Sequence, residues 1–250
     1  MRRVGPWVLA AGMALLVAGI ASTSLDAWDR EDPDREDRFA LPEGGAVGIG
    51  ESRVDQITLE AGDEAVLRYR PITLPVDEDR TEPRVEWRQE DGEWLLDADL
   101  GYVLHGTRLQ LPAHLSRLSG QVLAIEAKVP VADLQVEGGQ VSWEGDAGTL
   151  GMLAIPVRSR GCAEEAPTSS VKFGGGRVDE LRIASAQGQV GLGDLDGVGS
   201  IELRLAPGVA LRVARVADLE RIVILPFEGP APAPRYDTGR PLACGDHQEF

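Results

Sequence analysis

The chain has 250 residues and a formal net charge of −16, from 41 acidic and 25 basic side chains. A chain this acidic repels phosphate backbones, which argues against nucleic-acid binding and makes an anionic membrane surface an unfavourable partner. Hydrophobic residues make up 43% of the chain, which excludes wholesale disorder, while 30 glycines and 16 prolines leave little room for long helices. Only Lys128 and Lys172 are lysines, and the arginines are scattered rather than clustered with aromatic residues.

The first residues have the pattern of an export signal. Arg2 and Arg3 precede an uncharged apolar run, Val4–Ile20, and small residues suited to cleavage follow it. We expect residues 1–24 to be a signal peptide or, if uncleaved, an N-terminal anchor, since about 18 apolar residues can just span a bilayer. The rest of the chain then lies in the periplasm or another extracytoplasmic compartment of a bacterium. Membrane contact is expected only through residues 4–21, and only if the signal is uncleaved.

Residues 25–45 have the composition of an acidic flexible linker. The stretch Asp26–Arg38 holds seven acids and three arginines around Pro33. Such a run cannot bury apolar surface, so we expect it to be solvated. A cation-binding acidic tract is the alternative, but bound Ca²⁺ needs a fixed loop geometry that nothing in this stretch supplies.

Residues 46–227 have the alternating apolar pattern of short, half-buried strands throughout. An aliphatic-x-x-aliphatic-x-aliphatic pattern recurs five times, and its starts are Val131, Leu150, Val178, Val198 and Leu219. Successive starts are roughly 20 residues apart except for one longer step, which contains an expected insertion, residues 158–176. A step of about 20 residues predicts an all-β fold, a single-stranded β-helix or solenoid whose stacked coils share one core. A β-sandwich is the alternative, because its turns also recur at short, regular intervals.

Three segments carry a resemblance to a known family. Val178–Leu192 resembles one rung of the bacterial GIN domain, an auto-transporter adhesin head family. Val54–Val66 is similar to the opening strand, turn and strand of that family, and Val85–Leu95 resembles its following hairpin. The resemblance spans about residues 47–227, although the turns here read Ala-Gln-Gly and Ala-Pro-Gly where the family has Ser-Gly-Ser-Gly. It implies an exported β-helical module for adhesion or scaffolding, with no catalytic residues to carry over.

The two cysteines, Cys162 and Cys244, lie in the part of the chain expected to be exported. A cysteine pair in an oxidising compartment most often forms a disulfide, and this one would tie the Pro-rich tail, residues 228–250, back to the body. The alternative, a catalytic Cys244 thiol with His247, leaves Cys162 without a role.

Other candidate sites are weak. Asp97 and Asp99 could pair as carboxylates near His105 for glycoside hydrolysis, but a solvated strand face is the favoured explanation in so acidic a chain. Asp194 and Asp196 lack the further ligands of a Ca²⁺ loop, so a turn between coils is favoured. Tryptophans and tyrosines could stack on sugars from an exposed face, but core packing is the more common role. We therefore predict no catalytic residue, no metal site and no cofactor.

The leading functional hypothesis is an exported, non-catalytic, adhesin-like binding or scaffolding module of the bacterial cell envelope. Its expected partner is an envelope protein or glycan. The alternative is an enzyme that acts on envelope polysaccharide through a carboxylate-lined groove on the β-helix. A third hypothesis is a purely structural component of the envelope without a specific ligand.

Overall fold

The structure is a computed structural model that describes residues 35–41, 45–50, 54, 56–69, 84–90, 92–99, 107–159, 169–230, 232 and 235–237. Within these residues the chain is all-β, as the sequence predicts, apart from one short 3-10 segment. The elements in chain order are β1 (Arg35–Ala40), β2 (Ala46–Ile49), β3 (Gln56–Glu60), β4 (Glu64–Tyr69), β5 (Arg84–Glu90), β6 (Glu93–Asp99), β7 (Arg108–Pro112), β8 (Arg117–Ala154), β9 (Val157–Ser159), β10 (Ser170–Gly175), β11 (Val178–Ser185), β12 (Gln189–Leu192), β13 (Val198–Leu205), β14 (Ala210–Val213), η1 (Val216–Arg221), β15 (Ile222–Pro226) and β16 (Arg235–Asp237). No helix in the described ranges is long and apolar enough to cross a membrane.

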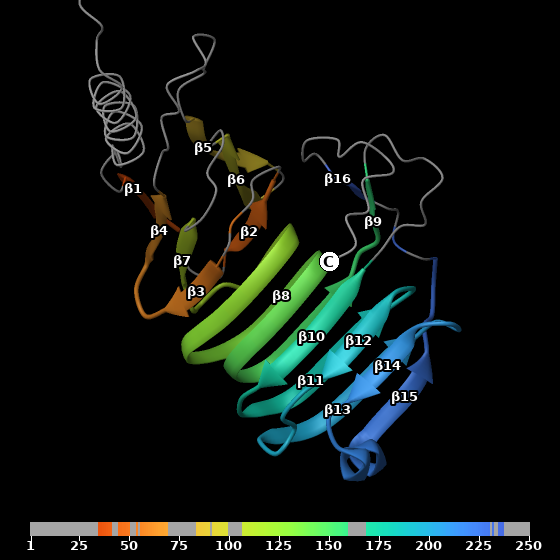
Figure 1. Cartoon of the computed structure of the whole chain (residues 1–250). Helices are drawn as coiled ribbons and strands as arrows, with labels where there is room; N and C mark the ends of the chain where they lie inside the picture. The colour runs from red at the N-terminus through yellow and green to blue at the C-terminus, as the bar shows by residue number, and fades with distance from the viewer. Residues whose placement is uncertain are drawn as a thin grey trace, which may run out of the picture.

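Most of these strands form one large mixed sheet, which does not close on itself. Two ladders of strands run through it and meet in β8, a strand of 38 residues that bends through both (Figure 1). The first ladder has the order β1-β4-β7-β3-β8-β10-β12-β14. The second runs β5-β6-β2-β8-β11-β13-β15. Strands β9 and β16 form a separate pair.

The strands β10 to β15 pair in parallel with one another within each ladder, and β10 and β11 also pair in parallel with β8. Val190 of β12 pairs with Val171 before it and with Leu211 after it, and Leu181 of β11 pairs with Ile201. Partners among β10 to β15 are therefore roughly 20 residues apart, which is the step that the sequence predicts. Parallel strands at this offset leave one turn of chain between successive neighbours in each ladder. The pairs with β8 have a longer offset, because residues 155–169, which include β9, lie between β8 and β10.

The register differs from the sequence pattern at one place. Val178 pairs with Ala147, so Leu181 faces Leu150 and Ile183 faces Met152. The repeat in this part of β8 therefore begins three residues before Leu150, where the sequence pattern began. Ala147 occupies the position that Val178 has in the next strand. Because this stretch is rich in aliphatic residues, the same pattern also matches from Leu150, three residues later.

Inward side chains of successive strands lie in rows because the pairing is in register. In the second ladder Met152, Ile183 and Leu203 form one such row, and each is at most 1% exposed. Ile224 of β15 continues the row but is 54% exposed, because no described strand follows β15 at this end. The buried rows of both ladders belong to one hydrophobic cluster, which also includes Trp143.

The corners between the ladders are tight enough to require glycine. Gly176, between β10 and β11, has a φ of +132°, and a Cβ atom there would lie 1.8 Å from the carbonyl oxygen of Gly145. A side chain at Gly176 would therefore collide with the backbone at Gly145. Gly145 itself has a φ of +137° at the equivalent corner of β8.

Part of the segment expected to be a flexible linker is a strand. Residues 35–40 form β1, which pairs antiparallel with β4 at the end of the first ladder (Figure 1). Glu36 accepts hydrogen bonds from Arg38 and Arg68 at 2.7 and 2.8 Å, and Arg38 also reaches Glu64 at 3.1 Å. Arg35, Glu36 and Arg38, three of the charges that suggested a solvated linker, are therefore exposed side chains of an edge strand, where they discourage pairing with other chains.

The segment expected to be an insertion, residues 158–176, also contains ladder structure. Its last residues form β10, which pairs with β8 and β12 and so belongs to the first ladder. Its first residues continue β9, which pairs in parallel with β16. The tail thus returns to the insertion, while Cys162 and Cys244 themselves lie outside the described residues.

Candidate functional site

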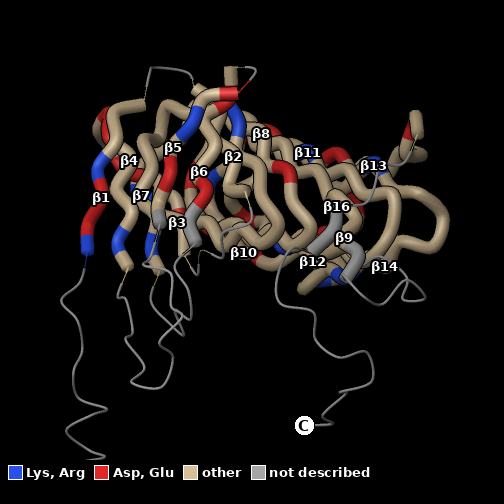
Figure 2. The backbone as a smooth tube through the Cα atoms, turned by 90° about the horizontal axis from the view of Figure 1, so that it is seen from above, with Lys and Arg blue, Asp and Glu red and all other residues tan. Residues whose placement is uncertain are grey.

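The outer faces of the two ladders carry the polar side chains, and parallel register places these in rows as well. On the first ladder Ser142, Lys172, Gly191 and Arg212 follow one another across β8, β10, β12 and β14. On the second ladder Gly151, Arg182, Glu202 and Val223 do the same across β8, β11, β13 and β15. Acidic and basic positions are interspersed along these faces rather than segregated (Figure 2).

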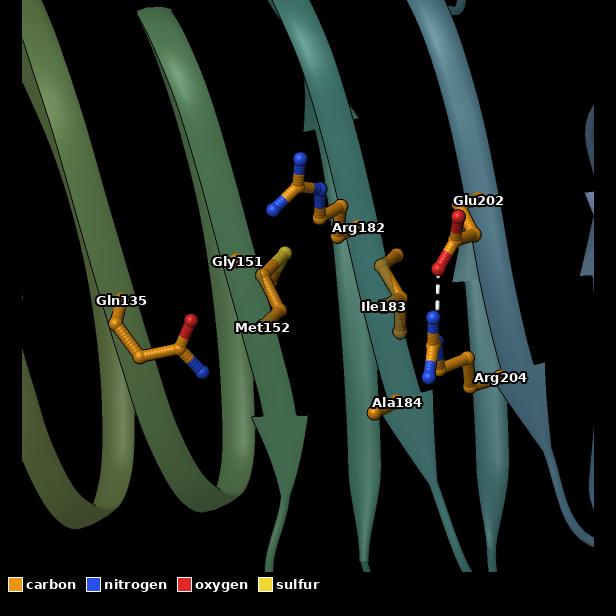
Figure 3. Close-up of a pocket in the computed structure, with 8 residues that line it drawn as sticks. All are labelled: Gln135, Gly151, Met152, Arg182, Ile183, Ala184, Glu202 and Arg204. Atoms are coloured by element: carbon orange, nitrogen blue, oxygen red, sulfur yellow. Dashed lines mark hydrogen bonds and ion pairs between the residues drawn. The ribbon is translucent and has the colours of Figure 1, made fainter. Parts of the chain in front are cut away.

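Three open depressions lie on these faces. The first, here called the paired-charge depression, has a volume of about 410 Å³ and is lined by Gln135, Gly151, Arg182, Glu202 and Arg204 among others. Gly151 lies between Gln135 and Arg182 (Figure 3), and the end of the Gln135 side chain covers it, since a Cβ atom at Gly151 would lie 2.0 Å from Gln135 Oε1. Each cation of this depression has an acidic partner.

The partners in the paired-charge depression lie two residues away on the same strand. Arg204 Nε donates to Glu202 Oε1 at 2.7 Å (Figure 3). Arg182 Nη2 donates to Glu180 Oε2 at 2.6 Å. The hydrogen bond to Glu202 raises the pKa of Arg204 above its ordinary value, so this cation stays charged and paired. The depression is therefore close to neutral.

The second depression, here called the basic depression, has a volume of about 440 Å³ and lies over β10, β12 and β14. Lys172 and Arg212 stand on either side of Gly191, one strand away in each direction. Ser170 and Gln189 line it from the adjacent row. Its lining contains no acidic residue, and among the residues that the structure describes neither Lys172 nor Arg212 makes a side-chain ion pair or hydrogen bond.

The third depression, here called the mixed depression, is smaller, at about 230 Å³, and lies beside the basic depression on the first ladder. Gln56, Glu126, Glu144 and Lys172 line it. Gln56 Nε2 donates to Glu126 Oε2 at 3.1 Å, and Lys128 forms an ion pair with the same carboxylate group. Acids outnumber cations in this lining, so it differs in charge from its neighbour.

The turn with Asp194 and Asp196 is held by an arginine. Arg215 Nη2 lies 2.5 Å from Asp196 Oδ1 and 3.4 Å from Asp194 Oδ1, and its Nε donates to Asp218 Oδ2 at 3.3 Å. The hydrogen bond from Arg215 lowers the pKa of Asp196 below its ordinary value. The ion pairs of Arg215 with these two carboxylates thus link successive corners of the sheet. No group of three or more His, Cys, Asp or Glu side chains that could hold a metal ion occurs in the described part of the chain.

The described residues do not show Asp97 and Asp99, the carboxylates considered for glycoside hydrolysis, as a pair. Asp97 lies on β6 and forms an ion pair with Arg88 at 3.9 Å. The side chain of Asp99 and the whole of His105 fall outside the described residues, as do the proposed disulfide partners Cys162 and Cys244. The structure therefore offers no geometry for these candidates.

The aromatic residues that the structure describes pack rather than line a depression, with Trp143 at the edge of the mixed depression as the exception. Trp143 is nevertheless 1% exposed, and its Nε1 donates to Gly145 O at 3.1 Å. Phe39 stacks on Trp87 at a ring-centroid distance of 5.1 Å and meets Trp94 edge-on at 4.6 Å. Trp143 therefore packs in the core, which is the more common role of an aromatic residue.

The basic depression has no counterpart among the sites expected from the sequence. The rarity of lysine is the only sequence feature that marks Lys172, and nothing marks Arg212. The two residues are far apart in the chain, and only the parallel register of β10, β12 and β14 brings them to one row. The usable signal was the step of about 20 residues, which places Lys172, Gly191 and Arg212 at equivalent positions of successive repeats.

Comparison with known proteins gives only distant likenesses. No family model matches the chain, and no curated protein matches it. Among solved structures, a candidate adhesin from Parabacteroides merdae ATCC 43184 is similar with 9% identity and a TM-score of 0.29, over 81% of this chain and 95% of that one. A candidate cell adhesion protein from Clostridium sporogenes ATCC 15579 is similar with 12% identity and a TM-score of 0.26, over 82% and 98%. Likenesses of this degree carry no argument about fold or function, so the proposals below rest on the residues themselves.

Proposed function

We propose that the chain is an exported, non-catalytic, adhesin-like binding module of the bacterial cell envelope, with its ligand surface on the outer faces of the two ladders. The observation that carries this proposal is the combination of buried inward rows with polar outer faces that hold open depressions. A long polar face suits an extended ligand, whereas catalysis requires reacting groups held together around a substrate. The export pattern of residues 1–24 supports the proposed location.

The scaffold of this module is a β-solenoid with coils of about 20 residues. The parallel offsets of roughly 20 residues among β10 to β15 support this architecture over a β-sandwich, whose sheets are antiparallel. Each coil adds one strand to each ladder, so outward residues recur at regular intervals along the face. The solenoid domain spans residues 46–227, and β1 extends its first ladder toward the N-terminus.

A disulfide between Cys162 and Cys244 fastens the tail to the body. The pairing of β16 with β9 supports this bond, because β9 ends three residues before Cys162 and β16 ends seven residues before Cys244. The closed loop, of roughly 80 residues, would stabilise the fold by about 4 kcal/mol in the chain-entropy model. Mass spectrometry of the chain recovered from the envelope, digested without reduction, is expected to find the linked peptides. Two free thiols would contradict the bond.

The function is tested by binding and turnover measured on the same samples. The chain recovered from the cell envelope is presented to immobilised glycans and envelope proteins, and each captured ligand is then weighed by mass spectrometry. We expect saturable binding that leaves the ligand chemically unchanged. Shortened or modified glycan would show instead that the protein is an enzyme.

Two matched variants assign the binding to a face. Gly151→Phe fills the paired-charge depression and Gly191→Phe fills the basic depression. The nearest atoms to the would-be Cβ of Gly191 lie at 3.9 Å, and the close contact of Gly151 is the flexible end of Gln135, so both side chains can be accommodated. Loss of binding in one variant and not in the other supports the proposal. Unchanged binding in both would show that these outer faces do not hold the ligand.

A further inference from the structure

The basic depression holds two cations, Lys172 and Arg212, that form no ion pair in the described structure, although Lys172 also borders the mixed depression with Glu126 and Glu144. We infer that it binds the anionic group of an acidic glycan, a carboxylate or sulfate of a sugar chain, between Lys172 and Arg212. This inference rests on the proposed function and names the ligand class of one of its faces. It is carried by charge pairing, by the geometry around Gly191 and by the polar residues alongside.

Charge pairing separates this depression from the paired-charge depression. There, Arg182 and Arg204 each donate to a glutamate on their own strand, at 2.6 and 2.7 Å. Lys172 and Arg212 are exposed, and in the described part of the chain their side chains have no such partner. In a chain with a net charge of −16, two uncompensated cations around one hollow form a local site for an anion within a surface that repels polyanions elsewhere.

The geometry leaves room for a shared anion. Lys172 pairs with Gly191, and Gly191 pairs with Arg212, so the two cations are two strand spacings apart, about 9.5 Å between backbones. Gly191 contributes no side chain to the space between them, and the nearest atoms to its would-be Cβ lie at 3.9 Å. Long, flexible side chains on both sides can converge on one oxyanion over the glycine.

The neighbouring residues favour a sugar chain over other polyanions. Ser170 and Gln189 line the depression beside the cations, and hydroxyl and amide groups can both donate to and accept from sugar hydroxyls. The lining contains no aromatic side chain on which a nucleic-acid base could stack. β14 has no described partner on its far side, so an acidic peptide could add there as a strand, and poly-glutamate is therefore the competing ligand in the test.

The test uses a ligand pair that differs only in charge. The chain recovered from the cell envelope is titrated with polygalacturonate fragments and with the same fragments fully methyl-esterified, at low and at high salt. We expect the free-acid fragments to bind and the esterified fragments to bind at least about tenfold more weakly at low salt, with the difference shrinking at high salt because screening weakens exposed ion pairs. Dextran sulfate against dextran repeats the comparison for sulfate.

Charge-matched variants locate the site. Lys172→Gln with Arg212→Gln removes two positive charges from the basic depression and is expected to weaken binding of the free acid about tenfold, as for two exposed ion pairs. Arg182→Gln with Arg204→Gln removes the same two charges from the paired-charge depression and is expected to leave binding within about twofold. Circular dichroism melting curves establish that both variants are folded.

The outcomes separate this inference from the proposed function. If glycans or envelope proteins bind with equal strength regardless of their charge, or if the two double variants lose affinity equally, the inference is overturned while the binding function stands. Tighter binding of poly-glutamate than of polygalacturonate would also overturn it, in favour of an acidic peptide. If no glycan and no envelope protein binds at all, the proposed function falls as well.

Discussion

The same substitution at two positions of one inward row should have very different costs. Ile183 on β11 is 1% exposed and has a neighbour in the row on each side, Met152 and Leu203. Ile224 on β15 occupies the last position of the row and is 54% exposed. Replacing either by alanine removes the same atoms, so the difference reports how completely each position is enclosed.

The magnitudes follow from burial. Ile183→Ala deletes three carbon groups at about 0.8 kcal/mol each, and the enclosed cavity raises the loss in the free energy of unfolding to about 3 to 4 kcal/mol. At Ile224 about half of the transfer energy is already absent and the site is open, so the loss is about 1 kcal/mol. Urea unfolding of the two variants and the wild type, followed by circular dichroism, measures both losses.

Equal losses at the two positions would refute this reasoning. They would mean either that Ile224 is enclosed as fully as Ile183 or that the row does not exist. A loss larger at Ile224 than at Ile183 would contradict the register itself, because β15 would then lie inside the stack rather than at its end.

Two further predictions concern the corners of the sheet. Arg215→Ala should lower the melting temperature at pH 7 and have a smaller effect near pH 3. The lowered pKa of Asp196 stabilises the folded state above the ordinary aspartate pKa of about 3.9. This contribution is lost as the pH falls through the pKa that Asp196 has in the folded state. An effect independent of pH would rule out the ion pair as its cause. Gly176→Ala should cost more than about 3 kcal/mol, since its Cβ would overlap Gly145 O, whereas Gly208→Ala, with a φ of +92° and no atom within 4 Å, should cost about 1 to 2 kcal/mol of backbone strain. Similar melting temperatures for these two variants would contradict the close packing of the corner.

The sequence was informative where local pattern and long-range packing agree. Alternating aliphatic residues predicted strands, and the step of about 20 residues predicted the offset at which β11 and β13 pair. Both signals arise because each strand must turn one face to a shared core, so the same apolar pattern recurs in successive strands. The all-β class therefore followed from the sequence.

Predictions from the sequence pattern were wrong where the local composition does not reflect how the segment packs. The acidic run that ends at Arg38 resembles a solvated linker, yet its last residues form an edge strand, because an edge strand has a solvent-facing side that tolerates charge. In the same way β10 falls within the predicted insertion, residues 158–176, because the step between repeats is longer there than elsewhere. Neighbouring strands, which local sequence does not report, decide both cases.

The candidate site could not be found from the sequence for a related reason. Lys172 and Arg212 are ordinary surface cations when considered singly, and no local motif surrounds either one; only the step of about 20 residues relates them. They form a candidate site because neither has an acidic partner among the described residues and because Gly191 between them has no side chain. Both conditions depend on the register of β10, β12 and β14. A site that depends on missing neighbouring side chains leaves no motif in the sequence.

The proposed solenoid requires consecutive coils to stack in parallel and in register, because this arrangement creates the inward rows and the basic depression. Arg182 and Glu202 face each other on neighbouring strands, so Arg182→Cys with Glu202→Cys places two Cα atoms about 4.8 Å apart, within the range for a disulfide. Arg182→Cys with Arg204→Cys, two residues out of register, places them about 8 Å apart, beyond it. Peptide mapping without reduction is predicted to find the link in the first variant and not in the second. A link only in the second, or in neither, would contradict the stacking.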